Sequence, residues 1–240
     1  MKADNRLIVA IDVHTMEKVQ QLVERLGTSV SYYKVGMELF YSVGNEVITY
    51  LSKQGKSIFL DLKLHDIPNT VGQSLAALTE LKGISMLNIH ASGGPAMMAA
   101  AAEAVKNKAK ELGIAPPKLI AVTILTSINT KEWAELGYGV ELSAQVVHLA
   151  KLAKNAGLDG VVASPQEAAF IREACGDDFL VVTPGIRPSG AAINDQSRIA
   201  TPTGALLSGA SHLVIGRPIT AAEDPEQAVQ AILQEMREKP

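Results

Sequence analysis

The sequence predicts a single-domain α/β protein of the (β/α)8, or TIM-barrel, class. Short apolar segments rich in β-forming residues recur eight times, and amphipathic helical patterns lie between most of them. Segments that are apolar along most of their length are typical of strands buried on both faces, and alternation with helices requires parallel crossovers. Eight such units in 240 residues match one barrel.

The predicted strands occur along the whole chain. They are residues 7–13, 30–35, 57–62, 86–89, 119–125, 160–163, 179–182 and 212–215. Apolar residues at helical spacing follow the first, third and fifth strands. These are Met16, Val19, Leu22, Val23 and Leu26, then Val71, Leu75, Leu78 and Leu81, and finally Leu142, Val146, Leu149 and Leu152. Each face requires a sheet to pack against.

A closing helix is predicted at the end of the chain. Asp224 is its expected N-cap, and Pro225 lies in its first turn. Val229, Ile232 and Met236 form the stripe that we expect to be buried.

A doubly wound open sheet is the alternative to a barrel. In that fold the turn after the first strand commonly binds a dinucleotide through Gly-x-Gly-x-x-Gly. Here the corresponding turn reads Asp12-Val13-His14-Thr15, and the chain has no Walker-type Gly-Lys-Ser/Thr motif. The barrel is therefore the preferred fold.

Composition favours a small molecule as the partner. Hydrophobic residues make up 47% of the chain and charged residues 20%, which is ordinary for a globular protein. The formal net charge is −3 and only 4% of residues are aromatic, so neither a positive field nor stacking platforms favour nucleic acid. No apolar stretch approaches the roughly 20 residues that span a bilayer. With a lone cysteine, Cys175, and no signal-peptide pattern, we expect a cytoplasmic protein.

Charged residues gather at the ends of the predicted strands, where barrel enzymes place their active sites. The densest group lies in residues 61–66, where strand alternation puts Asp61 and Lys63 on one face. Together with Asp12, Lys34 and Asp66 they predict an array of alternating charge. Such an array keeps a lysine protonated and repels an anion placed beside a carboxylate, which suits carbanion chemistry. A purely structural ion pair is the alternative.

The last two strand ends predict a phosphate site. Gly216 and Arg217 follow the eighth strand, where barrels often bind phosphate, and Arg217 adds a planar group of donors. Residues 183–202 form the one long irregular stretch, contain Arg187 and Gln196, and are long enough to close over a ligand. A solvent-exposed arginine and a disordered surface loop are the alternatives.

No metal site is predicted, because His14, His148 and His212 have no partner at metal-ligand spacing. His65 and His90 lie nearest the barrel mouth, where we expect them to support other groups through hydrogen bonds.

Five segments, taken in order, resemble one enzyme family. They are Val9-Ala10-Ile11-Asp12, Lys34-Val35-Gly36, the run DLKLHDIPNT from Asp61 to Thr70, Thr183-Pro184-Gly185-Ile186-Arg187, and Ile215-Gly216-Arg217. The chain resembles the bacterial type of orotidine 5′-phosphate decarboxylase over essentially its whole length. The Asp-x-Lys-x-x-Asp element alone also occurs in sugar-phosphate enzymes on the same barrel, so the resemblance depends on all five segments.

The resemblance implies conversion of orotidine 5′-monophosphate to UMP and CO2 without a cofactor, the last step of de novo pyrimidine synthesis. It also implies a homodimer with active sites at the subunit interface. Lys63 would protonate pyrimidine C6 and Asp61 would orient it. The other implied contacts are Asp66 and Thr70 from the partner subunit, Asp12 and Lys34 at the ribose, Thr126 and Ser127 at the pyrimidine, and Arg187, Gln196, Gly216 and Arg217 at the phosphate.

Three other functions compete with this one. A magnesium-dependent sugar-phosphate decarboxylase or synthase of the same superfamily has an acidic metal ligand where this chain has Lys34, and an ammonium cannot coordinate Mg²⁺. A Schiff-base aldolase needs a neutral Lys63, whereas flanking carboxylates favour the ammonium form. A non-catalytic nucleotide-binding barrel has little use for carboxylates beside an anionic ligand. Magnesium-dependent turnover would identify the first of these, and trapping with borohydride the second. Tight UMP binding without turnover of orotidine 5′-monophosphate would identify the third.

Overall fold

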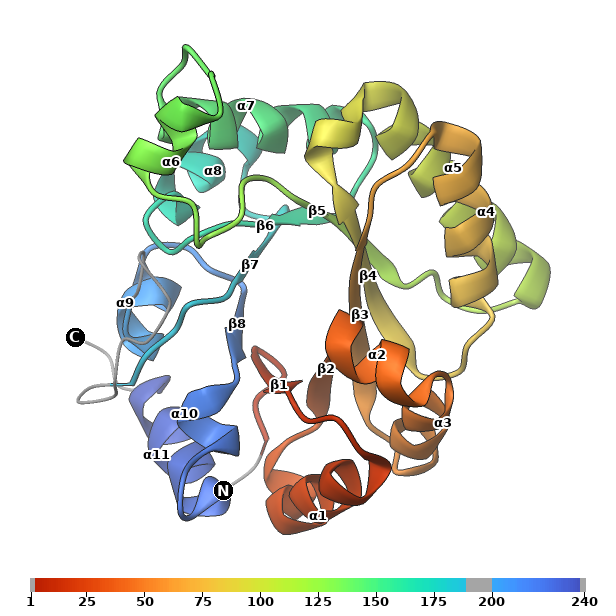
Figure 1. Ribbon diagram of the computed structural model, residues 1–240, viewed down its shortest axis with the longest axis vertical. Helices are drawn as coiled ribbons and strands as arrows, with labels where there is room; N and C mark the ends of the chain where they lie inside the picture. Colours follow the sequence, from red (N-terminus) through yellow and green to blue (C-terminus); the bar gives the residue numbers. More distant parts are fainter. Residues whose placement is uncertain (1–2, 189–199, 238–240) are drawn as a thin grey trace.

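The computed structural model describes residues 3–188 and 200–237 of the chain. Eight parallel strands pair in sequence order, and the eighth pairs with the first, which closes a barrel. Figure 1 shows the strands as an inner ring with the helices outside it. The predicted (β/α)8 fold is therefore confirmed.

All eight predicted strands are present, with small differences at their ends. They are β1 (Leu7–Ile11), β2 (Tyr32–Gly36), β3 (Ser57–Leu64), β4 (Ile84–His90), β5 (Lys118–Val122), β6 (Gly160–Val162), β7 (Leu180–Thr183) and β8 (His212–Ile215). The largest shortening is in β5, which ends at Val122 where the sequence predicted residue 125. The largest extension at a carboxyl end is in β3, which reaches Leu64 because its last residues form an irregular pairing with β4.

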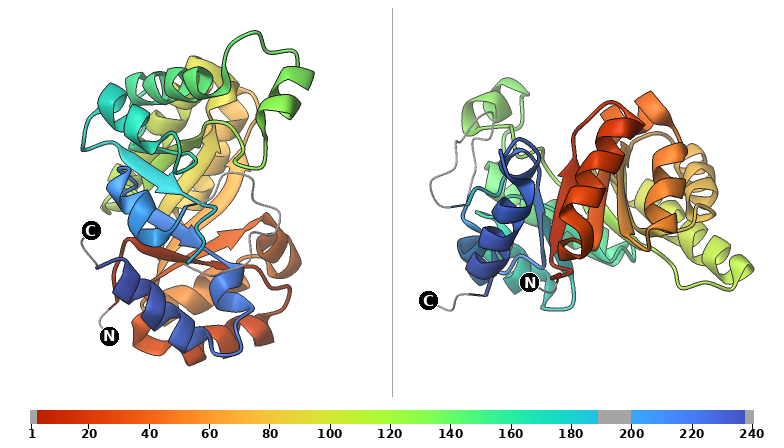
Figure 2. Two further views of the ribbon diagram at one scale, coloured as in Figure 1. Left: turned by 90° about the vertical axis from the view of Figure 1, so that its left-hand side faces the viewer. Right: turned by 90° about the horizontal axis from the view of Figure 1, so that it is seen from below.

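Helices cover the outside of the barrel. They are α1 (Met16–Leu26), α2 (Met37–Val43), α3 (Glu46–Lys53), α4 (Pro68–Thr79), α5 (Gly94–Leu112), α6 (Thr130–Glu135), α7 (Leu142–Asn155), α8 (Ala168–Cys175), α9 (Pro202–Leu207), α10 (Arg217–Thr220) and α11 (Pro225–Glu235), with 3₁₀ turns η1 (Gly27–Ser29) and η2 (Ala91–Gly93). Figure 2 shows α6 standing out on the side toward which the strand arrows point. No helix in the described ranges is long and apolar enough to cross a membrane.

The helices predicted from periodicity are α1, α4, α7 and α11, and each buries its apolar face. In α11 the Asp224 side chain accepts hydrogen bonds from the main-chain N–H groups of Glu226 and Gln227, so the predicted N-cap is confirmed. Val229 and Ile232 lie on the buried face of α11, also as predicted. Most of the other helices have eight residues or fewer, about two turns at most, which is too short for a periodic apolar pattern to be distinctive.

Two apolar layers stabilise the barrel and determine where its open space lies. The outer layer packs the outward faces of the strands against the helices. The inner layer fills the barrel with residues from alternating strand positions: Ile8, Ala10, Tyr32, Phe59, Met86, Ile120, Val182 and Val214. Because these side chains close the interior, a ligand can reach only the ends of the strands.

Candidate active site

Four of the predicted site residues form one continuous array at the carboxyl ends of β1, β2 and β3. The Nζ atom of Lys34 lies 3.7 Å from Oδ1 of Asp12 and 3.4 Å from Oδ2 of Asp61. The Nζ atom of Lys63 lies 2.7 Å from Oδ1 of Asp61. We call Asp12, Lys34, Asp61 and Lys63 the charge array; its charges alternate along its length, as the sequence predicted.

Asp61 is the buried centre of the charge array. Its side chain is 10% exposed, whereas the side chain of Asp12 is 48% exposed. Solvent and salt screen a buried ion pair less than an exposed one, so the contacts of Asp61 with the two lysines are the stronger ones. The same two ammonium groups offset the cost of burying its carboxylate.

The local structure of β3 differs from the regular alternation that the sequence suggested. Leu60 pairs with Leu87 of β4 and Leu64 pairs with Ile89, so residues 61–63 lie opposite the single residue 88. Lys63 has a φ of +52°, and it is the only non-glycine residue with a positive φ in the described parts of the chain. The side chains of Asp61 and Lys63 are in contact, as predicted. Their two-residue spacing favours this contact, and so does a bulge in the strand that the sequence did not indicate.

A pocket of about 180 Å³ lies beside the charge array. Lys34, Asp61 and Lys63 form its charged side, and Thr126, which follows β5, also lines it. The rest of its wall is mainly apolar and consists of Phe59, Val122, Ile124, Leu125, Val162, Pro184 and Val214. The apolar wall lowers the local dielectric, which strengthens the field of the charged side on any group bound there.

Asp66, Thr70 and Ser127 are predicted site residues that do not join this pocket. All three are exposed. One carboxylate oxygen of Asp66 accepts a hydrogen bond from the main-chain N–H of Ile67, and no ion pair within the described residues links Asp66 to the charge array. In a single chain the array therefore has four members and not five.

Of the predicted phosphate residues, Arg187 follows β7, and Gly216 and Arg217 follow β8. Arg187 is 7% exposed, and its main-chain N–H donates to Ala200, which joins the two ends of the long irregular stretch. Arg217 is exposed at the start of α10. A Cβ atom on Gly216 would lie 2.7 Å from Oδ2 of Asp12, so only glycine leaves that carboxylate in place. Gln196 lies outside the described residues.

His65 and His90 lie together next to the array, with ring centroids 5.4 Å apart. Burial lowers the pKa of His90, and the nearby His65 and Lys63 act in the same direction, while Asp61 opposes them. His90 therefore favours its neutral form beside the charge array. Their predicted role as hydrogen-bonding supports stays a prediction.

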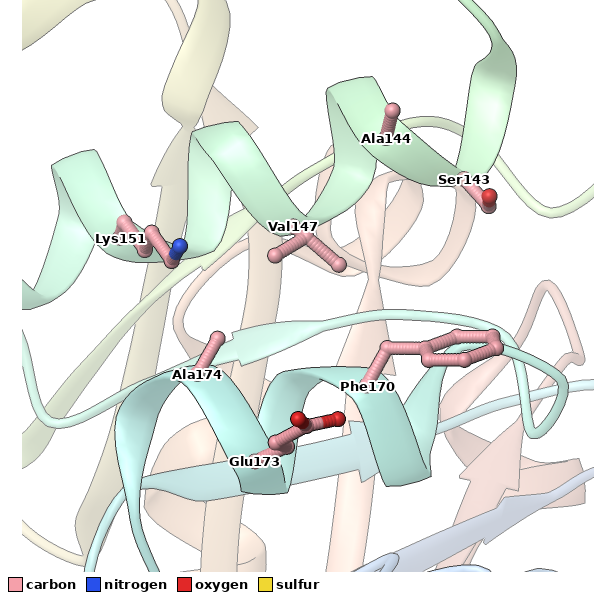
Figure 3. Close-up of a pocket in the computed structure, with 7 residues that line it drawn as sticks. All are labelled: Ser143, Ala144, Val147, Lys151, Phe170, Glu173 and Ala174. Carbon is pink, nitrogen blue, oxygen red and sulfur yellow. The ribbon is translucent and has the colours of Figure 1, made fainter.

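A larger groove lies elsewhere, between α7 and α8, with a volume of about 640 Å³. Figure 3 shows Val147 and Lys151 on one side of it and Phe170 and Glu173 on the other. None of the predicted site residues is among the described residues that line it. The charges that could act on a substrate are at the barrel mouth, so we assign the candidate site there.

Comparison with known proteins agrees with the fold and shows the family of this chain. Residues 5–232 match the family described as Orotidine 5′-phosphate decarboxylase / HUMPS. The chain is 49% identical to the orotidine 5′-phosphate decarboxylase of Moorella thermoacetica, covering 98% of this chain and 94% of that one. It is 50% identical to that of Carboxydothermus hydrogenoformans, covering 96% and 95%. The crystal structure of orotidine 5′-phosphate decarboxylase from Lactobacillus acidophilus is 44% identical, with a TM-score of 0.86 over 98% of this chain and all of that one. The chain therefore belongs to the orotidine 5′-phosphate decarboxylase / HUMPS family.

Proposed function

We propose that this protein decarboxylates orotidine 5′-monophosphate to UMP and CO2, the last step of pyrimidine nucleotide synthesis, in the cytoplasm and without a cofactor. The observation that carries the proposal is the charge array beside a mainly apolar pocket. This arrangement suits a reaction in which negative charge develops on a carbon atom next to a fixed ammonium. The names of the relatives support the same reaction.

Lys63 is the proposed proton donor. The bond between pyrimidine C6 and the carboxylate breaks, CO2 leaves, and the bonding electron pair stays on C6. The ammonium of Lys63 stabilises that charge and then transfers a proton to C6, and the neutral amine regains a proton from solvent. Asp61 accepts a hydrogen bond from Lys63 at 2.7 Å and so orients its Nζ atom. Its carboxylate also disfavours the substrate carboxylate beside it, an unfavourable contact that CO2 loss relieves.

The remaining site residues bind the parts of the substrate that do not react. Asp12 and Lys34 bind the ribose hydroxyls, and Thr126 and Ser127 bind the pyrimidine region. Arg187, Gln196, Gly216 and Arg217 bind the phosphate. Phosphate is distant from C6, so this binding energy can be used to close the site and raise kcat.

The active form is a homodimer in which Asp66 and Thr70 of the partner subunit complete each site. The exposure of both residues, and of the apolar Ile67 between them at 65%, supports this proposal. Mixing inactive K63A and D66A chains tests it, because one site of each heterodimer then has an intact Lys63 and an intact partner Asp66. Random pairing should restore about a quarter of the wild-type activity. No recovery in heterodimers verified by mass would place Asp66 in its own chain's site, and an active D66A homodimer would place it outside the chemistry.

Lys34 distinguishes this reaction from a magnesium-dependent one. Its ammonium lies between the carboxylates of Asp12 and Asp61, within 4 Å of both. That is the position a divalent cation would need in order to bridge the two carboxylates, so the chain supplies its own cation there.

The direct test follows the pyrimidine absorbance of orotidine 5′-monophosphate with metal-stripped protein in excess chelator. Fast turnover that is absent in K63A, with the fold of K63A verified by circular dichroism, supports a cofactor-free decarboxylase. No turnover until magnesium and a sugar phosphate are supplied would refute the proposal and assign the protein to the metal-dependent branch.

A further inference from the structure

Asn88 of β4 is the single residue opposite the bulge that contains Asp61 and Lys63. It is 1% exposed and does not belong to the described residues that line the pocket. It lies behind the charge array and has no place in the proposed chemistry so far.

The side chain of Asn88 makes one hydrogen bond to each of the two residues. Its Nδ2 donates to Oδ1 of Asp61 at 2.7 Å, and its Oδ1 accepts from the main-chain N–H of Lys63 at 2.8 Å. The opposite orientation of the amide would face oxygen to a carboxylate and NH₂ to an N–H group, so the chemistry of the partners fixes the orientation.

These two hydrogen bonds hold the backbone of Lys63 and the carboxylate of Asp61, which regular strand pairing would not do. The bulge leaves the N–H of Lys63 without a regular ladder partner, and Asn88 provides the acceptor. The left-handed conformation of Lys63 is costly for a residue with a Cβ atom, so it requires such external support. Oδ1 of Asp61 accepts two hydrogen bonds, one from Nδ2 of Asn88 and one from Nζ of Lys63, both at 2.7 Å.

We propose that Asn88 is a positioning residue for the decarboxylation: it holds the carboxylate of Asp61 and the backbone of Lys63 so that the ammonium lies where C6 must be protonated. This inference rests on the proposed function. Asn88 acts through its two neighbours and makes no contact with the substrate.

The first test is steady-state kinetics of N88A and N88D. N88A loses both hydrogen bonds, and we expect kcat to fall on the order of 100-fold, since small misplacements of a reacting group have effects of that size. KM should change less than about 3-fold, because the phosphate and ribose contacts are not touched. The matched control is T79V, which removes a buried hydroxyl that donates to Leu75 within α4 and should leave kcat within about 2-fold.

The pH profile of N88D separates positioning from a general structural role. The new carboxyl keeps an acceptor for the N–H of Lys63 but, when ionised, faces Asp61 with a second negative charge. When protonated, it can donate to Asp61 as the amide does, so kcat of N88D should rise as pH falls. N88A should show no such recovery. The other titratable or charged groups around position 88 are Lys63, Lys34 and His90, while its β5 neighbour is the apolar Ile120, and wild-type profiles account for those groups.

Crystal structures of the wild type and N88A provide a readout that does not depend on turnover. We expect the carboxylate of Asp61 to rotate, or Lys63 to leave its positive φ, in N88A. An unchanged contact between Asp61 and Lys63, or kcat values equal to that of T79V, would overturn the inference while leaving the proposed function intact. Absence of turnover in the wild type would instead refute the proposed function, and the two crystal structures would still decide the role of Asn88. If N88A fails to fold, N88D, which has nearly the same shape, carries the test.

Discussion

Lys63 offers a test of the strained backbone at the centre of the site. Its φ of +52° lies in the left-handed region, where a residue with a Cβ atom is disfavoured by about 1–2 kcal/mol. K63A and K63G both remove the ammonium, so both should lose turnover almost completely. They differ in the backbone, because only glycine adopts this conformation without the steric penalty.

The expected difference in stability can be worked out from that conformation. Glycine avoids about 1–2 kcal/mol of steric cost but loses about 0.5–1 kcal/mol more conformational entropy on folding than alanine. The net result is that K63G should be more stable than K63A by about 0.5–1 kcal/mol. With a urea slope of about 2–3 kcal/mol/M, the unfolding midpoint of K63G should lie about 0.3 M higher.

A second strand lysine provides the control for this comparison. Lys118 begins β5, also pairs with an aspartate, and is not among the residues with positive φ. There we expect the ordinary order, with K118G less stable than K118A. If K63G is less stable than K63A by the same margin as at position 118, the reasoning about strain at Lys63 is refuted.

Three further predictions follow from the site and from the opposite end of the barrel. R217A should lower kcat/KM by an amount equivalent to about 3–5 kcal/mol of transition-state free energy with the fold retained, because bound phosphate would bury its contact with the otherwise exposed Arg217, and unchanged kinetics would remove Arg217 from the site. G216A should displace the carboxylate of Asp12 and raise KM, whereas G139A, where a Cβ atom meets nothing within 4 Å, should behave as wild type; equal kinetics for the two variants would contradict the close approach. Burial lowers the pKa of His212, so below about pH 6.5 the unfolded chain binds a proton more readily than the folded chain does. The free energy of unfolding should therefore decrease as the pH is lowered. Urea midpoints at pH 7.5 and 5.5 measure this fall, H212Q should reduce it, and an equal fall in both proteins would exclude His212 as its source.

The fold could be predicted because its signals are local and repeated. Eight apolar segments separated by amphipathic stretches leave few topologies once crossovers must be right-handed. Short helices such as α2 and α3 were not resolved by periodicity, since Gly44 and Asn45 divide their segment into pieces of seven and eight residues. In α5 three of the six buried residues are alanine, namely Ala101, Ala102 and Ala109, and alanine gives little contrast with the exposed face.

The site was predicted less completely, for reasons that lie in pairing and assembly. Strand alternation predicted that Asp61 and Lys63 lie on one face. The bulge could not be predicted from the order of residues, because it depends on how β3 pairs with β4. For the same reason no role could be predicted for Asn88 from the order of residues, although its side chain contacts both Asp61 and Lys63. The expected contribution of Asp66 to the site of a partner subunit could be inferred only through the family resemblance, because one chain alone does not show which residues meet across an interface.

The order of the strands determines the order of the charges in the array. Asp12 follows β1, Lys34 lies in β2 and Asp61 in β3, and adjacent strands are about 4.8 Å apart. Opposite charges on neighbouring strands therefore meet, while the like charges of Asp12 and Asp61 are separated by a whole strand. The bulge then adds the positive charge of Lys63 to Asp61 without a further strand. Lys34 is consequently the cation that two carboxylates share, so neutralising it should disturb the positions of both, whereas neutralising the exposed Asp12 leaves the contact between Asp61 and Lys63 supported from β4.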